Sequence, residues 1–371
     1  MIIGVPKEIK NKENRVAITP IGVRKLVQSK HIVFVERNAG IGSGLRDAEY
    51  KEAGAKILRN AKAVYSKAEM IVKIKELISS EFDLVKPEQT IFTYLHLAAS
   101  ETLTMFLLNK KTTGVAYETI ETEDHKLPLL EPMSQVAGKM SIQVGAHYLE
   151  KTNQGRGVLL GGTDTVKPAK VVVIGSGIAG SNAANIARGM GADVTVLDVD
   201  DKKIKHINAK KDKLFRAKKS TKETIASEPK EADLVIGAVL IPGAKAPKLV
   251  TRQMIKNMKL GSVIVDIAID QGGCFETSKP TSHEHPIYIV DGVIHYCVTN
   301  MPGAVARTST LAITNVTLPY IRKLANKGIK KAIQSDENLA RGINTYDGKL
   351  TYKPVAEALN LNYIPLTNIL K

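Results

Sequence analysis

The stretch from residue 171 to residue 198 constrains the fold more than any other part of the chain. An apolar run, Val171–Ile174, is followed by the hexapeptide GSGIAG over residues 175–180, a small-residue segment and a second apolar run that ends at Asp198. Four β-branched residues in succession are typical of a strand buried on both faces of a parallel sheet. The pattern predicts a strand–loop–helix–strand unit within a doubly wound α/β domain.

Each glycine of the hexapeptide has its own role in a dinucleotide-binding unit. Gly175 would make the tight turn, Gly177 would let a pyrophosphate approach the backbone, and Gly180 would let the helix pack close to the strand. The predicted helix, from Ser181 to Met190, offers free N–H groups at its N-terminus and its positive dipole end to phosphates. The alternative is a glycine-rich turn that binds nothing, but the order of strand, glycines, helix, strand and acid favours a dinucleotide.

Asp198 indicates which dinucleotide is preferred. It stands 18 residues beyond Gly180, at the expected tip of the second strand. A carboxylate there can accept hydrogen bonds from the adenosine ribose hydroxyls and would repel a 2′-phosphate, which favours NAD over NADP. Lys202 and Lys203 follow closely and weaken that preference.

Composition is that of an ordinary globular protein of about two domains. Of the 371 residues, 43% are hydrophobic and 24% are charged. No apolar run approaches the ~18 residues of a membrane helix, and the N-terminus is interpreted as a first strand and not a signal peptide. Two cysteines, Cys274 and Cys297, cannot form a disulfide framework. We therefore expect a cytoplasmic protein that does not bind membranes.

The formal net charge of +16 raises the question of nucleic-acid binding. The densest basic run covers residues 202–222, but it contains few aromatic groups and no recognisable nucleic-acid motif. We interpret it as a solvated helix and loop beside the adenosine site, where it would affect solubility and the on-rate of anionic ligands. A nucleic-acid-binding protein remains an alternative that charge alone suggests.

The chain is expected to form two Rossmann-like α/β domains with parallel sheets, separated by an active-site cleft. Residues 1–128 alternate strand and helix patterns without a glycine fingerprint, so they are the predicted substrate side. Residues 129–306 hold the glycine loop and form the predicted nucleotide domain. A mostly helical segment, residues 307–371, is expected to return to the first domain, which makes the substrate domain discontinuous.

Individual elements follow from apolar runs and helix-start signals. A helix is expected to start at Thr19-Pro20 and to run toward Lys30, a long helix from Ser134 to about Lys151, and a third from Thr308 or Ser309 to about Lys327. The strand candidates are Ile2–Val5, Ile32–Glu36, Ile71–Ile74, Ile91–Leu95, Val115–Glu118, Val158–Leu160, Val171–Ile174, Val194–Leu197, Asp233–Val239, Val263–Ile269, Ile287–Val290 and Val293–Val298.

Arg15 and Lys75 are candidate substrate-binding cations. Arg15 stands between the first strand and its helix, where an arginine can fork onto a carboxylate. Lys75 closes an apolar strand candidate, at the sheet edge where open α/β folds bind ligands. Both residues could equally be solvated surface cations, and the sequence alone does not decide between these interpretations.

His96 and Asp270 are the candidate acid–base groups. His96 follows a buried strand candidate, where it could be either a core residue or a proton-transfer group with a pKa near physiological pH. Asp270 ends a long apolar run and precedes two glycines, with Asp266 as the competing carboxylate. Cys274 is interpreted as a small packing residue. No His/Cys cluster has zinc-ligand spacing, and the sequence contains neither GxSxG nor a P-loop.

Several longer motifs extend over essentially the whole chain in one register. They are GVPKE (4–8), NRVAITP (14–20), VKIKE (72–76), LHLAAS (95–100), PMS (132–134), GAVLIPGAKAP (237–247) and VDIAIDQGGCFE (265–276). Together they make the chain similar to bacterial L-alanine dehydrogenases. The transhydrogenase α subunit belongs to a related family that shares the fold but lacks the alanine site.

The resemblance implies an enzyme that reversibly deaminates L-alanine to pyruvate and ammonia with NAD, assembled as a homohexamer. Arg15 and Lys75 would hold the substrate carboxylate and carbonyl oxygen, and His96 and Asp270 would transfer protons. The implied cofactor contacts are Ser134, Gly175, Gly177, Ile178, Gly180, Asp198, Lys203, Ser220, Val239, Leu240, Ile267, Ala268, Ile269, Asp270, Lys279, Val298, Thr299, Asn300 and Met301.

The chain departs from the family pattern at a few positions. Lys323 and Lys327 stand where some members carry an acid and a histidine proposed as a magnesium site, so we predict no such metal. Ile178 replaces a smaller polar residue, and Lys279 replaces an arginine. A related amino-acid or glyoxylate dehydrogenase and a transhydrogenase-like NAD-binding module remain alternatives. The presence of Arg15, Lys75, His96 and Asp270 together argues against the second.

Overall fold

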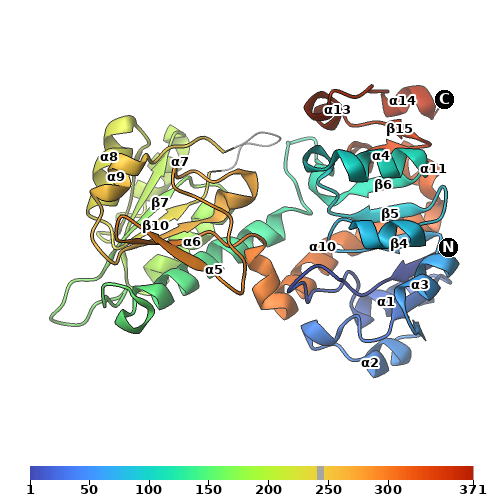
Figure 1. The fold of residues 1–371 in the computed structure, drawn as a ribbon, viewed down its shortest axis with the longest axis horizontal. Coiled ribbons are helices and arrows are strands. Elements are labelled where there is room, and N and C mark those ends of the chain that lie inside the picture. Colours follow the sequence, from blue (N-terminus) through green and yellow to red (C-terminus); the bar gives the residue numbers. More distant parts are fainter. Residues whose placement is uncertain (240–245, 371) are drawn as a thin grey trace. The chain divides into compact units, whose positions relative to one another are not determined.

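A computed structural model describes residues 1–239 and 246–370 of the chain. It divides into two compact units (Figure 1): unit 1 comprises Met1–Met133 and Gly303–Lys371, and unit 2 comprises Ser134–Pro302. The second unit is thus inserted into the first. The sequence-based boundaries, after residues 128 and 306, fall within five residues of these divisions.

Unit 1 is built on a sheet that combines N-terminal and C-terminal strands, blue to teal and red in Figure 1. Among the described residues its strand order is β15-β14-β6-β5-β4-β1-β2-β3. The strands β1 to β6 pair in parallel, whereas β14 is antiparallel to both β6 and β15. The bounds are β1 (Ile2–Val5), β2 (Ile32–Glu36), β3 (Lys56–Leu58), β4 (Met70–Val72), β5 (Thr90–Thr93), β6 (Thr113–Ala116), β14 (Ile343–Tyr346) and β15 (Lys349–Leu350).

The helices of unit 1 come from both of its chain segments. Thr19 caps α1 by accepting a hydrogen bond from Gly22 N at 3.3 Å, and Pro20 is the first helical residue, as predicted. The helices are α1 (Pro20–Gln28), α2 (Asp47–Glu52), α3 (Ala61–Lys67), α4 (Glu101–Asn109), α10 (Ala306–Lys327), α11 (Ile329–Gln334), α12 (Glu337–Arg341), α13 (Lys353–Leu359) and α14 (Leu366–Ile369). No helix in the described parts of the chain is long and apolar enough to cross a membrane.

Unit 2 contains the predicted glycine-loop unit at the centre of its sheet. The strand order is β12-β13-β11-β10-β7-β8-β9, so the chain reverses direction across the sheet between β7 and β10, at the position where doubly wound folds bind ligands. The bounds are β7 (Lys170–Ile174), β8 (Asp193–Asp198), β9 (Phe215–Lys219), β10 (Leu234–Gly237), β11 (Val263–Asp266), β12 (Ile287–Val290) and β13 (Val293–Tyr296), with α6 (Ile178–Gly189), α7 (Asp201–Asn208), α8 (Lys222–Lys230) and α9 (Arg252–Lys256).

The central strands of both sheets are buried on both faces, as their continuous apolar runs predict. Met70, Ile71 and Val72 of β4 are inaccessible to solvent, and so are Val171, Val172 and Val173 of β7. Because these strands are parallel, the loops that follow them lie at one edge of each sheet. Helix α5 (Glu131–Leu149) begins three residues before the expected Ser134 and spans the division between the two units.

The structure confirms two mostly parallel sheets, and antiparallel pairs occur only at their edges within the described residues. β12 is antiparallel to β13, and β14 is antiparallel to β15. Each pair is joined by an Asp-Gly turn, at Asp291-Gly292 and Asp347-Gly348, with positive φ at all four residues. Asp-Gly between two extended runs is a strong hairpin signal because these residues tolerate that backbone conformation. The sequence therefore held this information.

Other element predictions were wrong for local reasons. Residues 158–160 form no strand, because Val158 N bonds back to Leu149 O after the end of α5. Helix α10 starts at Ala306, before the predicted caps at Thr308 or Ser309, and Ser309 is already fully buried inside the helix. The run Val263–Ile269 is a strand only to Asp266, beyond which the chain turns into a 3₁₀ helix, η6 (Ile267–Gln271). The strands β3, β9, β14 and β15 were not predicted.

Candidate active site

Five polar residues of unit 1 follow four adjacent strands of its sheet. The strands β6, β5, β4 and β1 lie side by side and pair in parallel, so their carboxyl ends meet at one edge. Glu118 follows β6, His96 follows β5, Lys75 follows β4, and the segment containing Glu8 and Arg15 follows β1. The topology thus brings three of the predicted site residues to the same edge.

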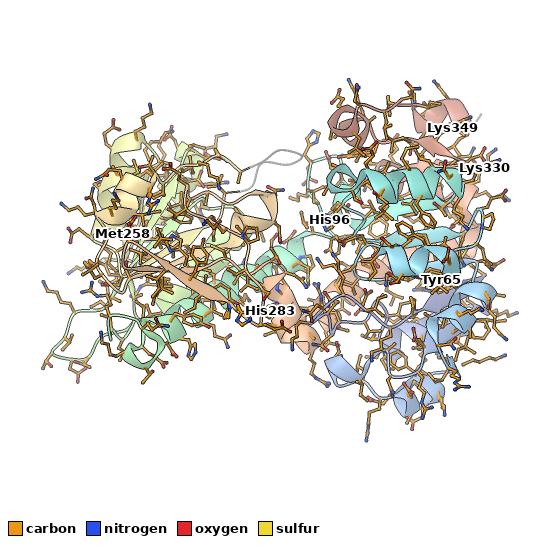
Figure 2. All side chains as sticks on the ribbon, in the orientation of Figure 1. Tyr65, His96, Met258, His283, Lys330 and Lys349 are labelled. Atoms are coloured by element: carbon orange, nitrogen blue, oxygen red, sulfur yellow. The ribbon has the colours of Figure 1, made fainter. Side chains whose placement is uncertain are left out.

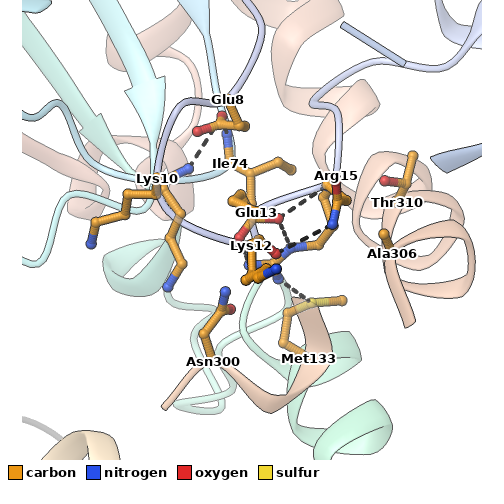
Figure 3. A network of polar contacts seen from close by, with 12 residues as sticks. Glu8, Lys10, Lys12, Glu13, Arg15, Ile74, Met133, Asn300, Ala306 and Thr310 are labelled. Atoms are coloured by element: carbon orange, nitrogen blue, oxygen red, sulfur yellow. Dashed lines mark hydrogen bonds and ion pairs between the residues drawn. The ribbon is translucent and has the colours of Figure 1, made fainter. Parts of the chain in front are cut away.

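Arg15 is buried and is not a surface cation, since only 2% of it is exposed. Figure 3 shows its side chain forked by Glu13: Nε donates to Oε1 at 2.7 Å and Nη2 donates to Oε2 at 2.5 Å. Nη1 donates to Met133 Sδ at 3.2 Å. Burial would lower the pKa of Arg15, but the hydrogen bonds and charge of Glu13 outweigh it and raise the pKa. Glu13 therefore fixes the plane of a permanently charged guanidinium.

Lys75 is half-buried, and its main chain is held from two directions. Glu8 Oε1 accepts hydrogen bonds from Ile74 N at 2.6 Å and from Lys75 N at 3.4 Å. The hydroxyl of Thr93 donates to Lys75 O at 2.9 Å. The ends of β1 and β5 thus both position the backbone from which the Lys75 side chain projects.

Lys73, two residues before Lys75, forms a buried ion cluster with Glu8 and Glu81 that was not predicted. Lys73 Nζ is 3.2 Å from Glu8 Oε2 and 2.9 Å from Glu81 Oε1, and Tyr65 (Figure 2) donates to Glu81 Oε1 at 3.0 Å. Burial would lower the pKa of Lys73, but the two carboxylates outweigh it and raise the pKa. Burial raises the pKa of Glu8 despite the charge of Lys73. The available signal was a lysine inside the otherwise apolar run 71–74.

His96 is exposed, which excludes the core-histidine interpretation. Figure 2 marks it after β5, in unit 1. Its backbone is in the left-handed region, with φ 49° and ψ 39°. Its ring stacks on that of Tyr94, with 5.8 Å between the centroids and 9° between the planes. An accessible imidazole on an ordered turn is suited to proton transfer.

The glycine loop of unit 2 has the features expected of a phosphate-binding turn. Gly175 has φ 93°, and a Cβ on Gly180 would lie 1.8 Å from Gly175 O, so both positions require glycine for the fold itself. A Cβ on Gly177 would meet no atom of the described residues within 4 Å. The packing of the described chain therefore gives no reason for glycine at 177, whereas close approach of a pyrophosphate to the backbone does. Helix α6 begins at the next residue and directs its N-terminus to the loop.

Asp198 ends β8 and is tied to the same loop. Its Oδ2 accepts hydrogen bonds from Ser176 N at 2.6 Å and Ser176 Oγ at 2.5 Å, and its Oδ1 accepts one from Asp200 N at 2.9 Å. Burial would raise the pKa of Asp198, but these hydrogen bonds and the charge of Lys203 hold it below its ordinary value. The carboxylate is therefore ionised and orders the glycine loop, a role that the sequence did not suggest.

Asp266 and Asp270 occupy different environments. Asp266 is fully buried and accepts hydrogen bonds from Ala268 N at 3.1 Å, Cys274 N at 2.9 Å and Ser278 Oγ at 2.5 Å. Burial raises its pKa despite these donors. Asp270 is exposed on η6. Asp266 thus organises the turn after β11, and Asp270 is the carboxylate available to a ligand.

The other predicted cofactor contacts of unit 2 lie in segments that follow its strands and on the helices α5 and α7. Ser220 comes directly after β9, and its N–H donates to Asp198 O at 2.8 Å. A Cβ on Gly175 would lie 3.1 Å from Val239 Cγ2. Lys203 is exposed on α7, Lys279 N donates to Tyr288 Oη at 2.7 Å, and Ser134 lies on α5. Leu240 lies outside the described residues. The remaining seven positions are Ile267, Ala268 and Ile269 on η6, and Val298, Thr299, Asn300 and Met301 after β13.

Lys323 and Lys327, at the positions where some family members have a proposed magnesium site, each have a polar partner in this structure. Lys323 Nζ pairs with Asp336, and Lys327 Nζ donates to Ser335 Oγ at 2.9 Å. Within the described parts of the chain, no group of three or more His, Cys, Asp and Glu could hold a metal ion. The absence of a metal requirement stays a prediction.

The fold and the glycine loop define a two-domain nucleotide-binding protein of the Rossmann class. Residues 4–137 match the family described as alanine dehydrogenase/PNT, N-terminal domain, and residues 141–353 match its C-terminal domain. The chain belongs to the alanine dehydrogenase/PNT family, which confirms the resemblance seen in the sequence.

Curated relatives and solved structures agree with this family. The chain is 56% identical to an alanine dehydrogenase of Methanococcus maripaludis, covering 98% of each, and 52% identical to one of Halomonas elongata, covering 100% of each. A solved L-alanine dehydrogenase superposes with a TM-score of 0.94 at 48% identity, covering 97% of this chain and 99% of that one. A transhydrogenase from Sinorhizobium meliloti superposes with a TM-score of 0.81 at 25% identity, covering 95% and 99%.

Proposed function

We propose that the protein is an NAD-dependent L-alanine dehydrogenase that interconverts L-alanine and pyruvate with ammonia. The observation that carries this proposal is the convergence of Arg15, Lys75 and His96 at one sheet edge of unit 1. Their chemistry matches a small amino acid with one carboxylate and one reacting carbon. The similarity to curated alanine dehydrogenases over the full length supports the same activity.

Substrate binding depends on the two cations. Arg15, oriented by Glu13, would bind the substrate carboxylate through its planar donors, and Lys75 would hold the oxygen that becomes the carbonyl of pyruvate. The backbone contacts of Lys75 to Glu8 and Thr93 limit its movement. A substrate fixed at both groups presents its α-carbon in one orientation, which supplies much of the rate in such reactions.

NAD fits the residues of unit 2. The open position at Gly177 and the N-terminus of α6 would receive the pyrophosphate, and Asp198 would accept hydrogen bonds from the adenosine ribose. Oδ1 of Asp198 accepts a hydrogen bond from Asp200 N, and because a carboxylate oxygen carries two lone pairs it can also accept one from a ribose hydroxyl. When bound, the nicotinamide supplies the redox chemistry by accepting the hydride from the α-carbon.

Proton transfer belongs to His96 and Asp270 in this proposal. Loss of the α-hydride turns the amine into an iminium ion, water adds to its carbon, and the carbon–nitrogen bond breaks to release ammonia. His96 and Asp270 would take protons from the attacking water and from the resulting hydroxyl, and return one to the leaving nitrogen. Both side chains are exposed in the structure, which suits exchange of protons with substrate and solvent.

The proposal is tested by following the absorbance of reduced nicotinamide with purified protein. L-alanine plus NAD should generate NADH, and pyruvate, ammonia and NADH together should consume it. Glyoxylate in place of pyruvate separates a related dehydrogenase, and binding of NADH without turnover of any amino acid would indicate a transhydrogenase-like module. No alanine-dependent change in either direction would refute the proposed activity.

We also propose that the enzyme works in the cytoplasm as a homohexamer, on the strength of the family resemblance. Light scattering coupled to size-exclusion chromatography measures the mass in solution. A mass of about six chains of 40.3 kDa is expected. A monomer that retains full activity would contradict the assembly.

A further inference from the structure

The backbone at His96 has a conformation that side-chain-bearing residues rarely adopt. Its φ of 49° and ψ of 39° lie in the left-handed region, which non-glycine residues occupy mainly where the surrounding structure enforces it. The conformation turns the chain sharply between the end of β5 and the short 3₁₀ helix η3 (Leu97–Ala99). It also sets the direction in which the imidazole leaves the backbone.

Glu118 holds this turn from the neighbouring strand. Its Oε1 accepts hydrogen bonds from His96 N at 2.6 Å and from Leu95 N at 3.2 Å, and its Oε2 lies 3.2 Å from Leu95 N. Two successive N–H groups that converge on one carboxylate form a small anion-binding concavity. One carboxylate therefore satisfies both backbone donors at the turn.

The sheet register explains why Glu118 can reach this turn. Thr93 at the end of β5 pairs with Ala116 at the end of β6. Glu118 stands two residues beyond Ala116, in the 3₁₀ helix η4 (Tyr117–Thr119), and His96 stands three residues beyond Thr93. The side chain of Glu118 therefore crosses from one strand end to the next.

Neighbouring contacts restrain the imidazole itself. The Tyr94 ring stacks on the His96 ring, and Tyr94 Oη donates to Leu129 O at 2.6 Å. The Tyr117 ring meets the Tyr94 ring edge-on, with centroids 5.0 Å apart. On the far side of the turn, Ala99 N donates to His96 O at 3.0 Å. Glu118 thus completes a set of restraints around a solvent-exposed side chain.

We infer that Glu118 is a positioning residue for His96: its carboxylate fixes the left-handed turn and thereby the direction of the imidazole, without itself exchanging a proton with substrate. The inference rests on the proposed proton-transfer role of His96. In the same way, Glu8 follows β1 and accepts hydrogen bonds from the backbone of Ile74 and Lys75, which follow β4. Glu118 therefore holds the segment after β5, and Glu8 holds the segment after β4.

Two conservative substitutions separate positioning from charge or proton transfer. Glu118→Gln keeps the length of the side chain and an amide oxygen at the place of Oε1, so it can still accept from both N–H groups but carries no charge. Glu118→Asp keeps the charge but shortens the reach by one methylene. Positioning predicts that the aspartate variant loses more activity than the glutamine variant, whereas a charge or acid–base role predicts the reverse.

The expected result is a loss in kcat of ~100-fold for Glu118→Asp and of less than about tenfold for Glu118→Gln, because small displacements of a catalytic group cost about that factor. The KM for alanine and the affinity for NADH should change little in both variants. Amide hydrogen exchange at His96 should accelerate in the aspartate variant more than in the glutamine variant. Glu121→Gln is a matched control: this residue lies on the same segment and contacts His125 on the surface, and its kcat should be unchanged.

The possible outcomes can be told apart from failure of the proposed function. If His96→Ala retains near-normal turnover, His96 is not the proton-transfer group, and Glu118 has no catalytic side chain to position. If His96→Ala is inactive but both Glu118 variants keep wild-type kcat, only the inference is wrong. If the glutamine variant is the more damaged of the two, Glu118 acts through its charge or its proton, and the positioning role is also wrong.

Discussion

Replacing Lys73 by methionine should remove the cation from the buried cluster behind Lys75. The ammonium lies 3.2 Å from Glu8 and 2.9 Å from Glu81, and only 1% of its side chain is exposed. Methionine has a similar length but no charge, so two carboxylates would be left buried without their cation. Breaking a buried ion pair in this way costs ~3–5 kcal/mol of unfolding free energy. We place Lys73→Met at the upper part of that range because two carboxylates lose a partner.

The pH dependence of this loss has a definite sign. Burial already raises the folded-state pKa of Glu8 in the intact cluster, and removing Lys73 would raise it further. The pKa of a glutamate in the unfolded chain is about 4.3. When the pKa in the folded state is higher, the carboxyl group destabilises the fold at pH values above the folded pKa, where it must ionise in a buried site. Below the unfolded pKa the group is protonated in both states and has no such effect. The difference from the parent protein should therefore be largest near neutral pH and shrink as the pH falls toward ~5.

Urea-induced unfolding followed by far-ultraviolet circular dichroism measures this difference at several pH values. Lys62→Met is the control, because Lys62 is exposed on α3, and its loss should stay within about 0.5 kcal/mol. The double variant Lys73→Met/Glu81→Gln should recover part of the stability, since one carboxylate is then neutral. A loss below about 1 kcal/mol, or one that does not vary with pH, would show that Lys73 does not neutralise Glu8 and Glu81 in the folded protein.

Two further predictions concern the glycine loop. Asp198→Ala should raise the KM for NAD by about tenfold or more, because the ribose acceptor and the hydrogen bonds to Ser176 are lost together. Steady-state kinetics with NAD and NADP should also show weaker discrimination against NADP. An unchanged cofactor preference would contradict the role of Asp198. Gly177→Ala should yield folded protein with weakened NADH binding. Gly180→Ala should fail to fold, because its Cβ would lie 1.8 Å from Gly175 O. If titration calorimetry gives Gly177→Ala the same NADH affinity as the parent protein, the pyrophosphate does not approach the backbone at Gly177.

The glycine loop shows how far a sequence can predict a site. Local spacing fixes a strand, a tight turn and a helix, so the roles of Gly175 and Gly180 were predicted, and the structure confirms that neither position accommodates a side chain. Arg15, Lys75 and His96 could be selected because each follows a strand candidate. The sequence alone could not decide whether they were surface cations or a core histidine, since that depends on burial.

The residues that position these groups could not be predicted. Glu8, Glu13 and Glu118 act through contacts that depend on which strands are neighbours and in which register. The order β6-β5-β4-β1 brings Glu118 and Glu8 to the two central strands, and strand order is not written in local periodicity. The hairpins at Asp291-Gly292 and Asp347-Gly348 are different, because their turn residues did carry a readable signal.

The turnover of a His96→Ala variant decides whether His96 is an acid–base group of the reaction. NADH formation from L-alanine and NAD would be measured beside the affinity of the same variant for NADH, so that a loss of chemistry is separated from a loss of binding. If His96 transfers protons, turnover should fall by at least about a hundredfold, the contribution of a general acid–base group, while NADH affinity stays within about twofold. Near-normal turnover by the variant would contradict it.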